Sequence, residues 1–159
     1  MEQPQKEFER LVREYEKDIY AICYLYASCE EEAKDLRQDT LINIWNGLPK
    51  FRGESSLRTW ITRLTINTCI SFKRKKKPET VGEEFVPQLA NPDLEATEQV
   101  KLLHRRLQRL EYLDRALVML WLENMSYDEI GAILGIAPKN VGVRLVRIKE
   151  KLKKIDDNE

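Results

Sequence analysis

The sequence predicts an all-α fold made of two small helical domains joined by a flexible linker. Apolar residues recur at steps of three and four in both halves of the chain, which is the spacing of amphipathic helices. No stretch alternates apolar and polar residues as a half-buried strand would. Residues 78–95 hold three prolines, an acidic excess and no helical period. We therefore expect them to be a tether between domains at residues 1–77 and 96–159.

The first half of the chain predicts three helices. An apolar stripe from Phe8 to Tyr26 indicates one long helix that carries Cys23 in the core. Residues 47–56, GLPKFRGESS, form a loop in which Ser55 or Ser56 can cap the next helix. The predicted inward residues of the second helix are Ala33, Leu36, Ile44, Trp45 and Leu48. Those of the third, which ends in the lysine-rich run 73–77 before Pro78, are Leu57, Trp60, Ile61, Leu64 and Thr68.

The second half predicts further helices that end in a helix-turn-helix. Periodicity resumes near Ala96, with Val100, Leu103, Leu107 and Leu110 on one stripe, and two more short helices complete the chain. Ser126 stands three residues before Glu129, which is the spacing of a capping box. Gly135 suits a left-handed turn, and Pro138 suits the first turn of a new helix.

The last helix carries a polar and basic face opposite its apolar one. Its inward residues are Val141, Leu145, Ile148 and Leu152, and its outward residues are Lys139, Asn140, Val143, Arg144 and Arg147. Arginine pairs with guanine and asparagine with adenine in the major groove, so this face suits a recognition helix. The alternative is an ordinary solvated face whose lysines favour a helix C-terminus. The cap, the turn glycine and the proline together favour DNA binding.

Charge and composition narrow the class of protein. The formal net charge is zero, yet residues 41–80 hold nine Lys/Arg against two Asp/Glu, and residues 138–154 hold seven against one. These are two separate positive regions. No apolar run approaches the roughly 18–20 residues of a membrane span, and the first residues lack a signal-peptide core. Three cysteines without metal-site spacing predict reduced thiols, and we expect a soluble, cytoplasmic protein without membrane insertion.

Three other classes of function can be weighed on the residues. An enzyme is disfavoured, because His104 is the sole histidine and no glycine-rich phosphate loop or ligand cluster is present. A dimeric helix-turn-helix regulator would use residues 126–154 but gives no role to FRGESS or to the acidic face of the second helix. A helical adaptor without nucleic acid gives no role to the basic face of the last helix.

Residues 33–76, with DLRQDT, FRGESSLRTW and RLTIN in this order, closely resemble region two of bacterial RNA polymerase sigma factors of the extracytoplasmic-function (ECF) group. The second half is similar to region four of the same group, and only the tether falls outside the resemblance. The resemblance implies a protein that binds core RNA polymerase, recognises the minus-35 and minus-10 promoter elements and promotes transcription initiation. It implies no active site, no cofactor and no metal, and it makes an anti-sigma factor a plausible partner.

The resemblance also assigns residues to three surfaces. Polymerase docking falls on Asp35, Gln38 and Asp39, an acidic patch that would steer association with a basic partner. Contact with the minus-10 element, whose unstacked base the loop would hold, is assigned to Lys50, Phe51, Arg52, Glu54, Ser55, Ser56, Arg63 and Asn67. Contact with backbone phosphate is assigned to Lys73 and Arg74. The minus-35 element falls on Lys139, Asn140, Val143, Arg144 and Arg147.

Three positions need separate treatment. Trp60 resembles an aromatic residue that assists melting, but its period places it in the core. Gly142 stands where the group commonly has Lys or Arg, and Gly131 where Ala is usual. A glycine inside a helix costs up to about 1 kcal/mol of helix stability. Gly142 also removes a side chain from the DNA-facing helix, so we expect minus-35 recognition to be atypical.

Overall fold

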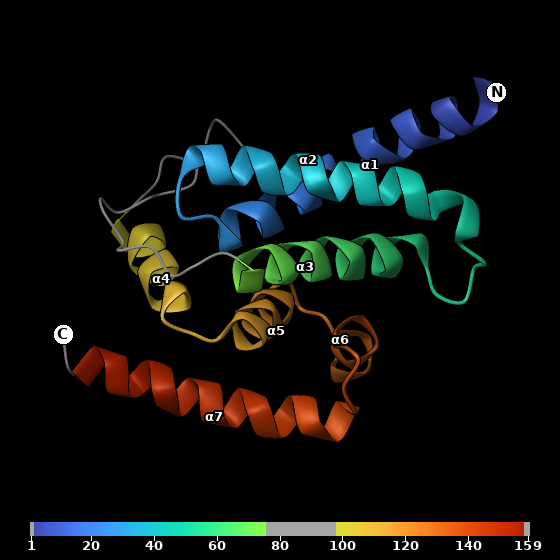
Figure 1. Cartoon of the computed structure of the whole chain (residues 1–159). Coiled ribbons are helices and arrows are strands. Elements are labelled where there is room, and N and C mark those ends of the chain that lie inside the picture. Colours follow the sequence, from blue (N-terminus) through green and yellow to red (C-terminus); the bar gives the residue numbers. More distant parts are fainter. Residues whose placement is uncertain (1, 76–97, 158–159) are drawn as a thin grey trace. The chain divides into compact units, whose positions relative to one another are not determined.

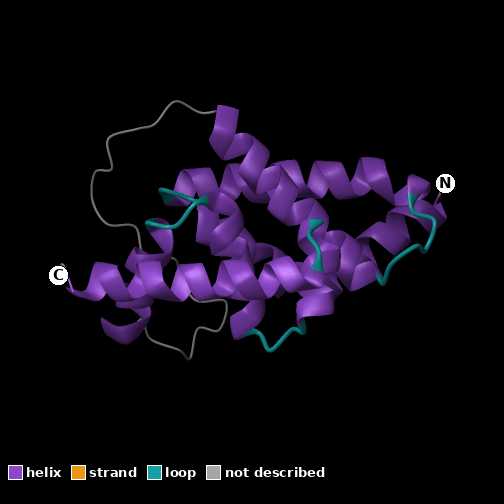
Figure 2. Cartoon of the chain, turned by 90° about the horizontal axis from the view of Figure 1, so that it is seen from below, coloured by secondary structure: helices purple, strands orange, loops and turns teal. Residues whose placement is uncertain are grey.

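The computed structural model describes residues 2–75 and 98–157, and within these ranges every regular element is a helix (Figures 1 and 2). The chain divides into two units, a first unit of Met1–Glu95 and a second unit of Ala96–Glu159. The prediction of an all-α fold is confirmed. The expected tether, residues 78–95, lies outside the described residues, and so do Lys76 and Lys77.

In the first unit three helices each pack against the other two. They are α1 (Glu2–Tyr26), α2 (Glu30–Gly47) and α3 (Leu57–Lys75), and a 3-10 turn, η1 (Leu48–Lys50), follows α2. Figure 1 shows them in blue, cyan and green. Their shared core consists of buried apolar side chains, among them Leu11, Ile19, Leu36, Ile44, Ile61 and Ile66. The prediction of one long first helix is confirmed.

Three buried threonines interrupt this apolar core, and each of their hydroxyls has a hydrogen-bond partner. The Oγ1 atoms of Thr40, Thr65 and Thr68 each donate a 2.7 Å hydrogen bond to the backbone carbonyl four residues earlier. Burying a hydroxyl without a partner costs free energy, and this local bond within the helix supplies one. The core therefore accepts threonine between its apolar residues.

The cysteines are free thiols. Cys23 of α1 and Cys69 of α3 are both fully buried, whereas Cys29 is exposed. A hydrogen bond from Cys69 lowers the pKa of Cys23, while the same bond and then burial raise the pKa of Cys69. The prediction that Cys23 is a core residue is confirmed.

Two apolar residues lie outside the stripes to which the sequence assigned them. Trp45 of α2 is 45% exposed and meets the Phe8 ring edge-on at 5.2 Å. Leu103 is 42% exposed. In each case the neighbouring residue, Ile44 or His104, takes the buried position. Successive helix residues point about 100° apart, so the two predictions of inward side chains are wrong.

The second unit consists of α4 (Glu98–Gln108), α5 (Tyr112–Leu122), α6 (Tyr127–Leu134) and α7 (Pro138–Asp157) in its described part. Helices α5, α6 and α7 pack on one another around Leu117, Leu120, Ile130, Ile133, Val141, Leu145 and Ile148. The last helix, expected to be short, is 20 residues long, because no proline follows Pro138 to interrupt it. Across the described ranges, no helix has both the length and the apolar character of a membrane span.

Candidate nucleic-acid interface

The turn between α6 and α7 has the local geometry that the sequence predicted. Ser126 Oγ accepts a hydrogen bond from the backbone N–H of Glu129 at 3.1 Å, which caps α6. Gly135 ends that helix in the left-handed conformation, with φ 74° and ψ 33°. Helix α7 then begins at Pro138. The helix-turn-helix is therefore confirmed.

Gly131 is required by the close approach of this turn. The N–H groups of Gly135 and Ile136 both donate to the Gly131 carbonyl, at 2.8 and 3.1 Å. A Cβ atom on Gly131 would stand 2.5 Å from the carbonyl oxygen of Ile136. That distance is well inside van der Waals contact, and the oxygen belongs to the backbone. Gly131, which stands where the resembling group usually has Ala, thus has a steric reason to be glycine in this chain.

Helix α7 presents a continuous exposed face opposite the core residues Val141, Leu145 and Ile148. We call this surface the α7 outer face, and it consists of Lys139, Asn140, Val143, Val146 and Arg147. Arg144 is half-buried at its edge. Val146 is 59% exposed and was missed in the sequence, although it stands one helical step after Val143. The outer face therefore combines cations, an amide and two apolar side chains.

The lysines after this face do not all extend it. The ammonium of Lys149 lies 4.5 Å from the centre of the Trp121 ring of α5, a cation–π contact that holds α7 against α5. Lys151, Lys153 and Lys154 are exposed. The basic end of α7 is therefore partly structural and partly available to solvent.

The loop before α3 is held by its own serines and an aromatic pair. Ser56 Oγ accepts from the Thr59 backbone N–H at 3.1 Å and so caps α3. The Phe51 and Trp60 rings lie 5.1 Å apart at 41°. A Cβ atom on Gly47 would stand 3.0 Å from the Trp60 ring. Trp60 is half-buried and joins the loop to the end of α2, in agreement with its predicted inward position.

The remaining predicted residues of the loop point to solvent. Exposed side chains belong to Lys50, Arg52, Glu54, Ser55 and Ser56, and only Phe51 among the predicted loop residues is half-buried. Gly53 has φ 75°, a conformation that glycine adopts without strain. The loop therefore offers two cations, a carboxylate and two hydroxyls beside one aromatic ring.

A hollow between α2 and α3 brings predicted residues of two surfaces together. Asn67 of α3 and Asp39 of α2 both line it, and its other walls include Ile42, Asn43, Ser71 and Lys75. The side-chain amide of Asn43 donates to Thr68 Oγ1 at 2.9 Å across the two helices. Arg63 is exposed one helical turn before Asn67. The sequence placed Asn67 on one surface and Asp39 on another, without indicating that both border one hollow.

Lys73 has a different setting from its neighbour Arg74. Its ammonium forms an ion pair with the buried carboxylate of Glu32 and donates to Ser28 Oγ at 2.8 Å. Only 12% of the Lys73 side chain and 1% of the Glu32 side chain are exposed. Arg74 and Lys75 are exposed. Lys73 follows the buried Cys69 by four residues, which puts it on the inner face of α3.

The acidic face of α2 is exposed and continues into apolar side chains. Asp35, Gln38 and Asp39 are all exposed. Ile42, 50% exposed, and Trp45 follow at helical spacing along the same side. We call these five residues the α2 outer face. The sequence missed its apolar end, because Trp45 was assigned to the core.

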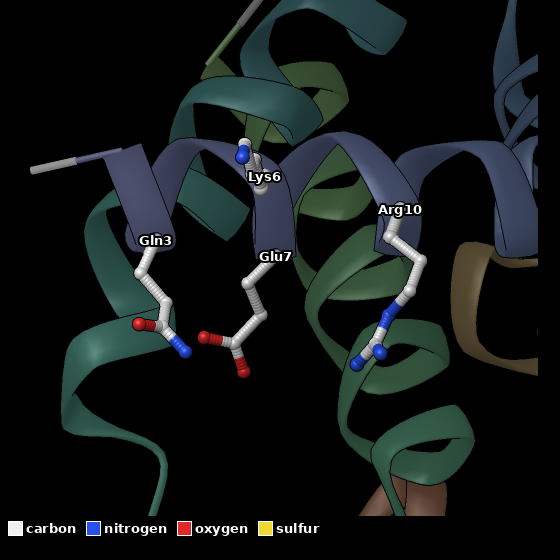
Figure 3. A pocket seen from close by; sticks show the side chains of 4 residues that line it. All are labelled: Gln3, Lys6, Glu7 and Arg10. Carbon is white, nitrogen blue, oxygen red and sulfur yellow. The ribbon is translucent and has the colours of Figure 1, made fainter.

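A second hollow lies beside the first turns of α1. Gln3, Lys6, Glu7 and Arg10 line it, and Figure 3 shows that Gln3, Glu7 and Arg10 project to one side of the helix while Lys6 projects to the other. All four are exposed, with two cations against one carboxylate. This mixture is typical of a solvated helix surface, and none of the four is among the site residues predicted from the sequence.

Comparison with known proteins matches both units. Residues 11–79 match the family model of sigma-70 region 2, and residues 101–152 match that of sigma-70 region 4. The RNA polymerase sigma factor YlaC of Bacillus subtilis (strain 168) is 32% identical over 155 residues, which cover 92% of this chain and 90% of that protein. The ECF RNA polymerase sigma factor SigW of the same organism is 27% identical, with 94% and 89% covered.

Solved structures share the fold. The sigma factor RpoE, in complex with the anti-sigma factor NepR from Bartonella quintana, has a TM-score of 0.74 at 22% identity, over 96% of this chain and 98% of that chain. CnrH, in complex with the cytosolic domain of CnrY, has a TM-score of 0.71 at 22% identity, over 98% and 90%.

Proposed function

Since this chain belongs to the RNA polymerase sigma factors, in their extracytoplasmic-function group, we propose that it recognises promoters and starts transcription through three surfaces of its own. The observation that carries this proposal is that the helix-turn-helix and the loop with α3 belong to separate units. Two units allow one chain to contact two promoter elements separated by spacer DNA. Residues 1–77 and 96–159 are the two functional domains of this proposal.

The α7 outer face reads the minus-35 element while the DNA is still duplex. Arg147 and Asn140 have the side chains that pair with guanine and adenine in the major groove, and Val143 suits a thymine methyl group. Lys139 and Arg144 complete the set named from the sequence. The exposure of this face opposite the buried apolar residues Val141, Leu145 and Ile148 supports the assignment.

The loop 50–56 and α3 hold the minus-10 element once the strands separate. An extruded base needs stacking and edge hydrogen bonds to offset the cost of unstacking. Phe51 supplies a ring, and Lys50, Arg52, Glu54, Ser55 and Ser56 supply polar groups around it. Arg63 and Asn67 contact the neighbouring bases. Arg74 contacts phosphate; for Lys73, the ion pair with Glu32 favours a structural role beside the predicted contact.

The α2 outer face docks on core RNA polymerase. Asp35, Gln38 and Asp39 give it negative charge, which steers association with a basic partner. Ile42 and Trp45 add exposed apolar area next to the carboxylates, and a few residues near the centre of an interface, often tryptophans, supply most of its binding energy. The α2 outer face therefore combines negative charge, which steers association, with exposed apolar area, which stabilises the complex.

We also propose an inhibitory partner and a cytoplasmic place of action. Both solved structures described above are complexes with a second protein, and one of these partners is named an anti-sigma factor. An anti-sigma factor that covers the α2 outer face would compete with polymerase. The chain acts by binding alone, without a catalytic site, cofactor or metal of its own, in the cytoplasm where polymerase meets the chromosome.

Run-off transcription tests this function. Purified core polymerase and the full chain are mixed with a library of genomic fragments from the host, and transcripts are sequenced. We expect transcripts that start a fixed distance downstream of a shared two-part element, and none with core alone. If no fragment yields a transcript that depends on the chain, the proposed function is wrong.

A further inference from the structure

We propose that Cys23 of α1 and Cys69 of α3 form a redox-active pair, which a hydroperoxide converts into a reversible disulfide inside the first unit. In the structure both residues are free thiols. None of the three proposed surfaces uses either side chain. The inference is therefore independent of the proposed function, and it gives a reaction to two core residues.

The two thiols meet where α1 packs against α3. Both side chains are fully buried, and they are hydrogen-bonded to each other. They stand far apart in the sequence, so the packing of the two helices brings them together. A disulfide joins its sulfur atoms at about 2 Å, and thiols already in hydrogen-bond contact reach that distance by a small adjustment. The third cysteine, Cys29, is exposed at the start of α2.

The surroundings of the pair distinguish its two sulfur atoms. The hydrogen bond from Cys69 lowers the pKa of Cys23 against the opposing effect of burial, and the positive charge of Arg37 adds to the lowering. The same hydrogen bond, and then burial, raise the pKa of Cys69 well above its usual value. The thiolate is the nucleophilic form of cysteine. Cys23 is therefore the sulfur that attacks, and Cys69 is the thiol that waits beside it.

The reaction consumes one hydroperoxide for each disulfide. The Cys23 thiolate attacks a peroxide oxygen, so that an S–O bond forms and the O–O bond breaks. Cys23 becomes a sulfenic acid, and the departing oxygen takes up the proton that Cys23 released on ionising. Cys69 then attacks the Cys23 sulfur, so that the S–S bond forms and the S–O bond breaks. The hydroxide that leaves takes the Cys69 proton and becomes water, so two thiols have lost two electrons to the peroxide.

Burial decides both the rate of this reaction and its value to the protein. A hydroperoxide reaches the sulfur atoms when the first unit opens locally, so the pair reacts more slowly than an exposed thiol. Oxidation beyond sulfenic acid is irreversible and gives charged products, and an unpaired charge in an apolar core is costly. Because Cys69 captures the sulfenic acid at once, the core of the first unit is protected from that damage. Thiol reductants reopen the disulfide by exchange.

The test uses the full chain with Cys29→Ser, which removes the exposed thiol and leaves the pair unchanged. The folded chain is treated with hydrogen peroxide, its remaining thiols are alkylated in denaturant, and its peptides are analysed by mass spectrometry. We expect a linked peptide pair that contains Cys23 and Cys69 and comes from a monomeric chain. Dithiothreitol should restore both thiols. Amide hydrogen exchange in α1 and α3 should slow at least about tenfold in the oxidised chain, because a disulfide restricts the unfolded state.

Cys69→Ser, added to Cys29→Ser, is the matched control, because it keeps Cys23 and removes the capturing thiol. In this variant peroxide should convert Cys23 to sulfinic and sulfonic acid, which dithiothreitol does not reverse. The disulfide itself is measured on a chain that retains the pair, so this result does not depend on how well the control folds. If peroxide leaves both thiols free, or links them only between two chains, the inference is wrong while the proposed function stands. A chain that starts no transcript contradicts the proposed function alone.

Discussion

Two glycines of the second unit tolerate a methyl group to very different degrees. On Gly131 a Cβ atom would stand 2.5 Å from a backbone oxygen, that of Ile136. On Gly142 it would stand 3.3 Å from the edge of the Tyr127 ring, which belongs to a half-exposed side chain that can move. Helix propensity favours alanine over glycine at both sites by about 1 kcal/mol. The two positions therefore differ only in the space available for a methyl group.

Gly131→Ala should lower the free energy of unfolding of the second unit by about 1–3 kcal/mol, the usual cost of overpacking. Gly142→Ala is the matched control and should change it by less than about 1 kcal/mol. Amide hydrogen exchange of residues 127–150 in the full chain measures this unit separately. If the amides of Gly131→Ala exchanged as slowly as those of the unchanged chain, the turn would accommodate the methyl group, and the steric argument from the 2.5 Å approach would be wrong.

At the scale of elements, one buried ion pair joins the start of α2 to the end of α3. Glu32 accepts from the backbone N–H of Ser28 at 3.1 Å and pairs with Lys73. A buried pair contributes little beyond an apolar replacement, but removal of one partner leaves a buried charge without compensation. The end of α3, which carries Arg74 toward solvent, therefore depends on Lys73 for its position.

Lys73→Met should lower the free energy of unfolding of the first unit by about 3–5 kcal/mol, because the Glu32 carboxylate loses its cation. Arg74→Met, at an exposed position, should stay within about 0.5 kcal/mol. Urea unfolding followed by circular dichroism checks both. Arg74→Met should instead weaken promoter binding and reduce its salt dependence. A neutral effect of Lys73→Met on stability would show that the internal pair contributes nothing.

The α2 outer face borders the hollow that also contains Asn67, so its residues need to be tested selectively. Asp39 lines that hollow, whereas Asp35 does not. Asp35→Lys should weaken the affinity for core polymerase, because it reverses charge in the docking surface. Opening of the minus-10 element, once the complex is saturated, should be unchanged. Fluorescence anisotropy of the labelled chain with core measures the affinity, and an unchanged value contradicts the docking assignment.

At the scale of the whole molecule, the two units should contribute to successive steps of initiation. The α7 outer face belongs to the second unit, and Asn67 to the first. Substitutions at sites without shared partners are usually additive in free energy. The units can therefore be tested against each other in one double-mutant experiment.

Arg147→Ala should cost about 1–3 kcal/mol of closed-complex binding, with relaxed discrimination at one base pair of the minus-35 element. Asn67→Ala should leave closed binding nearly unchanged and reduce strand opening. Permanganate reactivity of unpaired thymines measures the opening. In the double variant the two losses should combine without interaction. An opening defect in Arg147→Ala at saturating chain would show that the two units do not divide the steps in this way.

The sequence by itself determined the helices and the turn between α6 and α7. Ser126, Gly135 and Pro138 act on backbone groups within a few residues of themselves, so their effect is fully encoded locally. Four of the five residues of the α7 outer face were predicted for the same reason, since a helical period fixes which side chains share a side. Val146 follows the same period but was missed.

Only the tertiary structure decided which of these side chains are available. Lys73 was indistinguishable from Arg74 in the sequence until α3 packed against α2, where Glu32, 41 residues away, meets it. The Trp45 ring against Phe8, the hollow that Asn67 and Asp39 both line, and Tyr127 over Gly142 likewise involve different helices. Periodicity states which face of a helix is apolar, but the partner of each side chain depends on how helices pack, and packing is set by residues distant along the chain.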